Sequence, residues 1–311
     1  MTVPAEKLIW MYQTMYRIRY YEETMASAYK DKTDFSDIGG PAQDEMHSAA
    51  AGQEPAAVGI CAHLHKDDTL TASYRSHYNA IAKGVDLYKM TAAMLGKAAG
   101  LGRGNVGRMH LFDPAVKFCC GSAASGLSHA VGAALAAKTN KKDWVAVGFI
   151  GEGAANAGAF RESVNMAALW RLPVIFVIEN HSYSFPAPNR SSVNVRSNDM
   201  RGAAYGIPCV HVNDNDPLVI YRVSEAAVRR ARAGEGPTII EIGSDSEAYH
   251  ATGKEPEPRR RDPLLRLKCL LLQDGAASEE QIAALEGVAK RDMDQAYAFA
   301  RSSLSFLSPS V

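Results

Sequence analysis

Short apolar runs alternate with longer segments of helical periodicity through most of the chain. The most regular example begins and ends with apolar runs at 144–150 and 174–178, which are typical of strands buried in a parallel sheet. Between them, residues 156–170 place apolar side chains such as Phe160 and Val164 on one face of a helix. A strand, a helix and a second strand in this order predict a parallel pair whose carboxyl ends meet at one edge of a sheet.

The same alternation extends over the rest of the sequence and predicts the fold class. Further strands are expected at 69–73, 207–212 and 237–242, and helices at 5–29, 54–64, 86–97, 129–138, 217–232, 262–273 and 278–302. Strands that alternate with helices predict an α/β protein with a doubly wound, mostly parallel sheet, an N-terminal helical arm and C-terminal helices. We expect three parts: an arm and loop at 1–45, an α/β domain at 46–250, and a C-terminal helical segment at 251–311.

Composition and charge exclude some classes of function but do not identify one. Lys and Arg balance Asp and Glu at 34 residues each, so nothing favours binding to nucleic acid or to an anionic membrane. The five cysteines are odd in number and lack metal-site spacing, which indicates reduced thiols. The N-terminus has no signal-peptide layout and no apolar stretch is long enough to cross a membrane, so we expect a cytoplasmic protein that acts on a small molecule.

A glycine turn, Gly151-Glu152-Gly153, follows the first of the two strands and is the main candidate for binding chemistry. A dinucleotide fingerprint needs a third glycine where the chain has Asn156, and neither Gly-Lys pair continues into Ser or Thr as a phosphate loop requires. What is left is a carboxylate between glycines and an amide, Asn180, at the end of the next strand. Together these groups suit a hard cation that carries a diphosphate. The alternative is a turn that only joins a strand to a helix.

Residues 151–183, GEGAANAGAFRESVNMAALWRLPVIFVIENHSY, resemble the thiamin diphosphate motif of the α subunits of two-component 2-oxo acid and acetoin dehydrogenases. That family writes the motif as Gly-Asp-Gly, a helix, and then Glu-Asn-Asn. Blocks similar to family blocks, in family order, stand at 49–64, 73–86, 109–113, 204–216 and 260–267, so the resemblance covers nearly the whole chain. It implies the thiamin diphosphate-binding fold, with 46–250 as the diphosphate-binding domain.

The resemblance also implies which residues hold the cofactor. Tyr74 and Arg75 would touch thiamin diphosphate, with the arginine on its diphosphate. The turn and the next strand end supply the other cofactor-binding residues, which are Gly151, Glu152, Gly153, Ala154, Asn180 and His181.

By alignment with the family, the metal ligands fall on Glu152, His181 and the main-chain carbonyl of Tyr183, where family members have Asp, Asn and a carbonyl. Glutamate keeps the carboxylate. Histidine is the larger change, because Mg²⁺ prefers oxygen and imidazole suits softer metals. Three outcomes follow: Asn180 takes the ligand role, His181 recruits another divalent metal, or binding of metal and cofactor is weakened.

Three histidines are candidates for proton transfer at the substrate: His47, His77 and His110. Family members carry a histidine near His47, but here it stands one residue further from Gly52-Gln53-Glu54, with Ser48 in the expected place. One extra loop residue would reconcile the two patterns. The alternative is an exposed loop histidine.

Two departures from the family bring positive charge to the expected mouth of the site. Arg108 occupies a serine-sized position, and Lys254 stands where family dehydrogenases carry a histidine in a longer loop over the cofactor. Cations that face a pocket need an anionic partner, so both are candidates for substrate binding. We therefore expect carbon–carbon bond cleavage or formation, of transketolase or acyloin-synthase type, on an anionic 2-oxo acid, acyloin or ketose.

Two alternatives to this reaction are kept open. One is the E1 α subunit of an oxidative 2-oxo acid or acetoin dehydrogenase that feeds a lipoyl E2 carrier. The other is a non-catalytic α subunit that has lost cofactor binding.

The chain shows no candidate for the pyrimidine half of the cofactor site with its activating glutamate. Family α subunits borrow that half from a β subunit, so the resemblance implies a heteromer, α2β2. For the helix at 5–29 two alternatives are open: packing on its own domain, or an arm that crosses to a partner subunit.

Overall fold

The computed structural model describes residues 3–30, 51–74, 76–104, 110–180, 183–184, 187–188, 200–243 and 262–305, with the backbone alone at 29–30, 183–184 and 187–188. Within these residues, a seven-stranded sheet has the order β2-β3-β1-β4-β5-β9-β8, and a separate two-stranded sheet pairs β6 with β7. The strands are β1 (Thr69–Ser73), β2 (Phe112–Asp113), β3 (Phe118–Gly121), β4 (Ala146–Gly151), β5 (Val174–Asn180), β6 (Tyr183–Ser184), β7 (Ala187–Pro188), β8 (Cys209–Val212) and β9 (Thr238–Gly243).

Parallel pairing dominates the large sheet. β1 pairs in parallel with β3 and β4, β4 with β5, and β9 with both β5 and β8, whereas the short β2 runs antiparallel to β3. The chain begins near the middle at β1, adds β3 on one side, and then crosses to β4, β5, β8 and β9 on the other. This order confirms the predicted doubly wound α/β fold class. Folds of this kind bind ligands at the carboxyl ends of the strands, where the strand order reverses.

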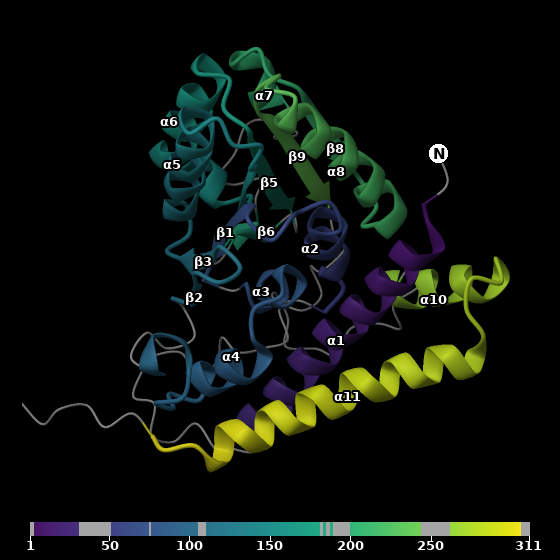
Figure 1. Ribbon diagram of the computed structural model, residues 1–311. Helices are drawn as coiled ribbons and strands as arrows, with labels where there is room; N and C mark the ends of the chain where they lie inside the picture. The colour runs from purple at the N-terminus through teal and green to yellow at the C-terminus, as the bar shows by residue number, and fades with distance from the viewer. Residues whose placement is uncertain are drawn as a thin grey trace, which may run out of the picture.

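Helices cover both faces of the sheet (Figure 1). They are α1 (Ala5–Lys30), α2 (Glu54–Cys61), α3 (His77–Lys83), α4 (Leu87–Met94), α5 (Ser125–Thr139), α6 (Gly158–Leu169), α7 (Met200–Ala204), α8 (Pro217–Arg232), α10 (Pro263–Gln273) and α11 (Glu279–Ser302), with 3₁₀ turns η1 (Leu101–Gly104) and η2 (Ala154–Asn156). One face packs on α5 and α6 through a core that includes Phe160 and Phe176. The other packs on α1, α2 and α8 through a larger core that includes Ile60 and Val177.

The N-terminal helix α1 packs on its own chain. Its predicted apolar stripe is buried, with Met11, Met15 and Ile18 at 0% exposure. α1 lies alongside α11 and also contacts α2, α3 and α10, so segments from the two ends of the chain lie side by side (Figure 1). Of the two alternatives for this helix, the described contacts show packing on its own chain.

Several helix boundaries differ from the sequence prediction: α2 ends at Cys61 rather than at 64, and α5 begins at Ser125 rather than at 129. Two further differences have local reasons. α6 begins at Gly158 because Ala157 has an extended backbone, with φ −65° and ψ 148°, which separates the helix from the 3₁₀ turn η2. α4 ends at Met94 rather than at 97, and Lys97 instead forms an antiparallel bridge with Ser305 near the C-terminus. In both places the chain leaves the helix to make a turn or a tertiary contact that periodicity does not encode.

Several short elements were not predicted at all. They are α3, α7, β2, β3, β6 and β7, and each has at most seven residues. A helix as short as α3 has too few turns for an apolar stripe to stand out, although Gly84 ends it in the left-handed conformation with φ 90°.

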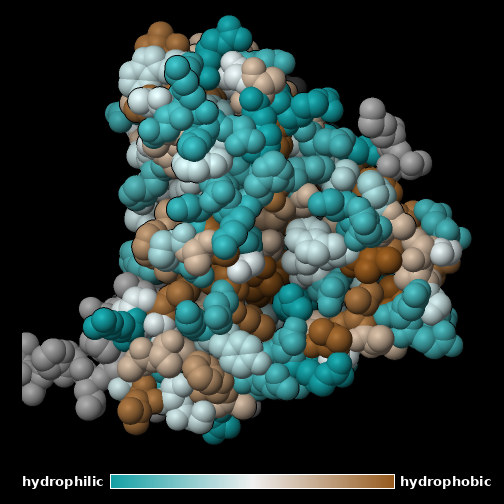
Figure 2. All heavy atoms as spheres, in the orientation of Figure 1, coloured by the Kyte–Doolittle hydropathy of each residue, from teal (hydrophilic) through white to brown (hydrophobic). Residues whose placement is uncertain are grey.

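No helix in the described part of the chain is both long and apolar enough to cross a membrane. On the face shown in Figure 2, hydrophobic side chains gather mainly in the lower half, in the region of α1, α10 and α11. Exposed hydrophobic residues on α10, on α11 and just beyond it include Leu265, Phe299 and Leu304. All five cysteines are free thiols, as predicted.

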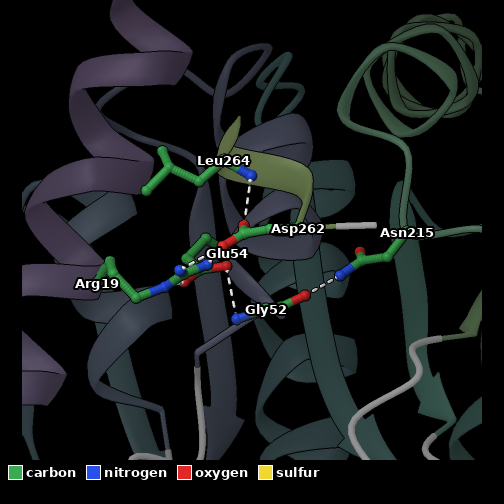
Figure 3. Close-up of polar contacts among 6 residues, drawn as sticks. All are labelled: Arg19, Gly52, Glu54, Asn215, Asp262 and Leu264. Atoms are coloured by element: carbon green, nitrogen blue, oxygen red, sulfur yellow. Dashed lines mark hydrogen bonds and ion pairs between the residues drawn. The ribbon is translucent and has the colours of Figure 1, made fainter. Parts of the chain in front are cut away.

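A buried arginine on α1 joins three parts of the chain that are distant in sequence (Figure 3). Arg19 Nε donates to Glu54 Oε1 at 2.5 Å, and both terminal nitrogens donate to the Asp262 carboxylate, at 2.9 and 3.1 Å. Glu54 opens α2 and is fully buried, and its second oxygen accepts from Gly52 N–H at 2.9 Å. Asp262 also caps α10 by accepting from Leu264 N–H at 2.9 Å. One guanidinium thereby holds the starts of α2 and α10 against α1.

Replacing Arg19 with methionine should lower the free energy of unfolding by about 3–5 kcal/mol, because it leaves the buried Glu54 carboxylate without its cation. Urea denaturation measures the loss. The matched control is Arg266→Met, since the Arg266 side chain is 52% exposed and pairs with Asp214 and Asp216 near the surface. Its loss should stay below about 1 kcal/mol. Equal losses in the two variants would contradict the role given to Arg19.

Candidate functional site

Three parallel strands end at the same edge of the large sheet, and this edge is the candidate site. β4 and β5 end in register, with Gly151 paired to Glu179. One residue further, Glu152 N–H donates to the Glu179 carbonyl at 3.0 Å, which draws the glycine turn onto the end of β5. β1 lies beside β4 and ends directly before Tyr74. The edge therefore brings together the glycine turn and the strand end at Asn180, as the strand–helix–strand pattern predicted, and Tyr74 follows the neighbouring strand β1.

Glu152 lies between the two glycines of the turn and is 2% exposed. The turn that follows it is held by Arg201 on α7, whose guanidinium donates to the Ala155 carbonyl at 2.9 Å and to the Asn156 side-chain oxygen at 2.7 Å. A Cβ built on Gly151 would meet no described atom within 4 Å, so the described residues leave space beside the turn. A buried carboxylate next to open space is a suitable place for a bound cation or a polar ligand.

Glu179 is a second acid at this edge. It is 5% exposed, its Oε2 accepts from Tyr78 O–H at 2.5 Å, and its Oε1 has no hydrogen-bond partner among the described residues. Burial raises the pKa of Glu179 to about 7, the hydrogen bond from Tyr78 opposes this shift, and the charge of Glu152 adds to it. Two acids thus share a buried edge, and a cation bound there would relieve their repulsion.

The side chain of Asn180 lies on the opposite face of the sheet from that of Glu179, because successive residues of a strand alternate. Asn180 Nδ2 donates to Glu241 Oε1 on β9 at 2.7 Å. Glu241 is fully buried, and its Oε2 lies 3.0 Å from His211 Nδ1 on β8. The end of β5 therefore carries polar groups on both faces, with Glu179 on the side of α3 and Asn180 on the side of α6.

Two of the three candidate histidines belong to the described residues. His77 is the first residue of α3; its Nδ1 lies 3.6 Å from Glu22 Oε1, and its Nε2 has no hydrogen-bond partner in the described part of the chain. His110 is exposed and lies near the end of β3, where a Cβ on Gly121 would stand 3.8 Å from its ring. β1 and β3 both end at the candidate edge, so both histidines stay candidates for proton transfer.

The other predicted site residues lie outside the residues that the structure describes. They are His47, Arg75, Arg108, His181 and Lys254, together with the side chain of Tyr183, of which only the backbone in β6 is described. Their roles stay predictions.

Sequence analysis missed Tyr78 and Glu241. Glu241 interrupts the otherwise apolar strand β9, and a charge in a buried run is a signal that could have been used, because such a residue is almost always paired. Tyr78 gave no comparable signal, since its partner Glu179 is 101 positions away in the sequence.

The family model for the dehydrogenase E1 component matches residues 42–306, which include every described strand. The chain belongs to this family. Its relatives include the acetoin:2,6-dichlorophenolindophenol oxidoreductase subunit α of Bacillus subtilis (strain 168), which is 35% identical over 97% of this chain and 91% of the relative.

Two further relatives carry the names of 2-oxo acid dehydrogenases. The pyruvate dehydrogenase E1 component subunit α of Porphyra purpurea is 32% identical over 96% of this chain and 89% of its own. The 2-oxoisovalerate dehydrogenase subunit α of Bacillus subtilis (strain 168) is 36% identical over 74% of each chain. These matches confirm the resemblance seen in the motifs: the protein is an E1 α chain, and thiamin diphosphate is the cofactor of its family.

Replacing Glu179 with glutamine should change how the stability of the metal-free E1 α chain depends on pH. The folded-state pKa of Glu179 is about 7 and its ordinary value is 4.5, so the folded state keeps a proton that the unfolded state loses between these values. The free energy of unfolding therefore falls as pH rises through this window. Relative to Glu179→Gln, the wild type should lose about 2–3 kcal/mol between about pH 5 and pH 8.

Urea denaturation at the two pH values measures this difference. Glu162→Gln is the control, because Glu162 lies on the exposed face of α6. It should keep the pH dependence of the wild type. Identical pH profiles for wild type and Glu179→Gln would show that Glu179 does not hold its proton as described.

Proposed function

We propose that this chain is the α subunit of a two-component thiamin diphosphate enzyme that cleaves a carbon–carbon bond beside the carbonyl group of a 2-oxo acid or an acyloin. The observation that carries the proposal is the edge where β4 and β5 end in register, because it brings Glu152, Glu179 and Asn180 to the place where doubly wound sheets bind ligands. Membership of the E1 family supports the cofactor and the reaction class.

The residues at this edge fit a divalent cation that carries a diphosphate. In the described part of the chain no three His, Cys, Asp or Glu side chains gather into a metal cluster, so amide, main-chain and diphosphate oxygens would complete the coordination. Among the described residues, Glu179 Oε1 has no hydrogen-bond partner and no atom lies within 4 Å of a Cβ built on Gly151, and both observations support this fit. Glu152 would supply its carboxylate, Asn180 its amide oxygen and Tyr183 its main-chain carbonyl, an all-oxygen set that suits Mg²⁺.

When bound, thiamin diphosphate supplies a carbon nucleophile for a carbonyl group and an electron sink for the carbanion that bond cleavage leaves. The chain's own residues would hold and orient it. Tyr74 follows β1 at the same edge, and Arg75 is the next residue in the sequence. A guanidinium can contact a diphosphate with two parallel hydrogen bonds. His77 and His110 are candidates to donate a proton to the substrate carbonyl oxygen.

We infer further that a β subunit completes the enzyme. The relatives named above are α subunits, and the family takes the pyrimidine half of the cofactor site from the partner chain. An α2β2 assembly is the arrangement that we propose. Each α chain would then bind the diphosphate and the metal, and each β chain would activate the pyrimidine ring.

The acceptor of the cleaved fragment has two candidates. Relatives named for acetoin, pyruvate and 2-oxoisovalerate favour oxidative cleavage, with transfer of the acyl group to the lipoyl arm of an E2 partner. Ligation to an aldehyde is the second candidate. Arg108 and Lys254 favour it, because they place positive charge where the family carries a serine-sized residue and a histidine.

Calorimetric titration of the co-expressed α/β pair with thiamin diphosphate tests the site. We expect binding that requires Mg²⁺ and that is lost when the metal is chelated. Glu152→Ala should weaken this binding by roughly 100-fold, because removing one partner of a buried charged contact costs about 3 kcal/mol. Glu162→Ala, on the exposed face of α6, should bind like the wild type. A wild-type pair that binds no thiamin diphosphate would favour a non-catalytic α subunit instead.

Product identification separates the two acceptors. The α/β pair is supplied with pyruvate or acetoin and with either a lipoyl domain or an aldehyde, and the products are identified by mass spectrometry. We expect acylation of the lipoyl domain. A carbon–carbon ligation product with an unmodified lipoyl domain would reverse the choice and would assign Arg108 and Lys254 to an anionic substrate.

A further inference from the structure

Glu241 on β9 is a buried acid to which the proposed function gives no role. It interrupts an apolar strand and is fully buried. A carboxylate in such a position is costly unless it is hydrogen-bonded or paired. Glu241 Oε1 accepts a hydrogen bond from Asn180 Nδ2 at 2.7 Å, and its Oε2 lies 3.0 Å from His211 Nδ1. Its contacts therefore run across three neighbouring strands, β5, β9 and β8.

The hydrogen bond between Asn180 and Glu241 determines which end of the Asn180 amide faces Glu241. A carboxylate only accepts hydrogen bonds, so the amide must present its NH₂ group to Glu241 and keep its oxygen on the other side. A hard cation such as Mg²⁺ binds oxygen and not an amide nitrogen. Glu241 thus selects the orientation in which Asn180 can serve as a metal ligand.

Glu241 also interacts with the other half of the site through Arg201. Burial lowers the pKa of the Arg201 guanidinium, the charge of Arg161 adds to that shift, and the charge of Glu241 opposes it. Arg201 in turn donates two hydrogen bonds to the turn η2, which directly follows the Glu152 turn. One buried carboxylate is thereby linked to both strand ends that face the proposed cation.

We propose that Glu241 is a positioning residue of the metal centre, which orients the Asn180 amide so that its oxygen, rather than the His181 imidazole, is the second side-chain ligand beside Glu152. The inference rests on the proposed function, since it requires a cation at this edge. It makes the site selective for hard cations such as Mg²⁺ and Mn²⁺ over softer ones that favour imidazole.

Binding of Mn²⁺ to the α/β pair in the presence of thiamin diphosphate, followed by electron paramagnetic resonance, tests the proposal without turnover. Glu241→Gln should weaken Mn²⁺ binding by about 10–100-fold, the usual effect of losing a group that orients a metal ligand. Glutamine can donate as well as accept, so it no longer dictates which end of the Asn180 amide faces the cation. The matched control is Glu286→Gln on α11, which also removes a hydrogen-bonded carboxylate, because Glu286 accepts from Tyr12 and Lys268. This control should bind Mn²⁺ like the wild type.

A double variant separates orientation from a merely structural role. In Asn180→Asp with Glu241→Gln, the new amide at position 241 can donate to the new carboxylate at position 180, whose other oxygen serves the cation. We expect this double variant to recover most of the lost affinity. Asn180→Asp alone should bind Mn²⁺ no better than the wild type. It puts a second carboxylate beside Glu241, where the wild type has a 2.7 Å hydrogen bond, and two carboxylates this close must share a proton. Thermal unfolding checks that every variant is folded.

The outcomes distinguish this inference from the proposed function. Equal affinity of wild type and Glu241→Gln, no recovery in the double variant, or an imidazole nitrogen coupled to Mn²⁺ in the wild type would each overturn the role of Glu241 and leave the proposed function standing. A wild-type pair that binds neither Mn²⁺ nor thiamin diphosphate would overturn the proposed function and this inference together.

Discussion

Negative charge buried at the carboxyl edge of a parallel sheet is the constraint on which the site depends. Parallel strands bring their ends together, and here those ends carry Glu152 and Glu179, with Glu241 one strand further along. Burial and the charge of Glu152 both raise the pKa of Glu179, because this edge disfavours a further negative charge. Tyr78 donates a hydrogen bond to Glu179 and Asn180 donates one to Glu241, and the proposed divalent cation would offset negative charge at the same edge.

Buried charges are also paired in the frame around the site, which is formed by α1 and the starts of α2 and α10. The Arg19 guanidinium lies between two carboxylates, Glu54 and Asp262. Each carboxylate also accepts a hydrogen bond from a backbone N–H group at the start of α2 or α10. Asn215 adds a hydrogen bond to the Gly52 carbonyl and so connects the β8–α8 loop to this cluster (Figure 3). Protein groups pair the charges of this frame, whereas Glu179 Oε1 at the sheet edge has no hydrogen-bond partner among the described residues.

The chain shares its frame with the E1 family, and the proposed metal site depends on a few positions where this chain departs from the family pattern. Glutamate replaces aspartate at position 152, which keeps a carboxylate at the end of β4. Histidine at position 181 would break an all-oxygen ligand set, but the preceding residue, Asn180, already presents an amide at the same strand end. In the proposed site, a shift of one position along β5 would therefore offer a hard cation an oxygen without a change in the fold.

Local patterns in the sequence determined the fold class, most of the long elements and the family. The apolar runs of β4 and β5 and the helix between them could be recognised because each pattern repeats within a few residues, and α8 matches its predicted range because Asp216 and Pro217 mark its start. The motif residues Gly151-Glu152-Gly153 and Asn180 also identified the candidate sheet edge, because they lie within one short stretch of the sequence. Only the tertiary structure decided which side chains meet there. Glu179 and Tyr78 are 101 residues apart, Asn180 and Glu241 are 61, and Arg19 and Asp262 are 243. Such pairs depend on the register of neighbouring strands and on the face that each residue takes, and no local periodicity records either.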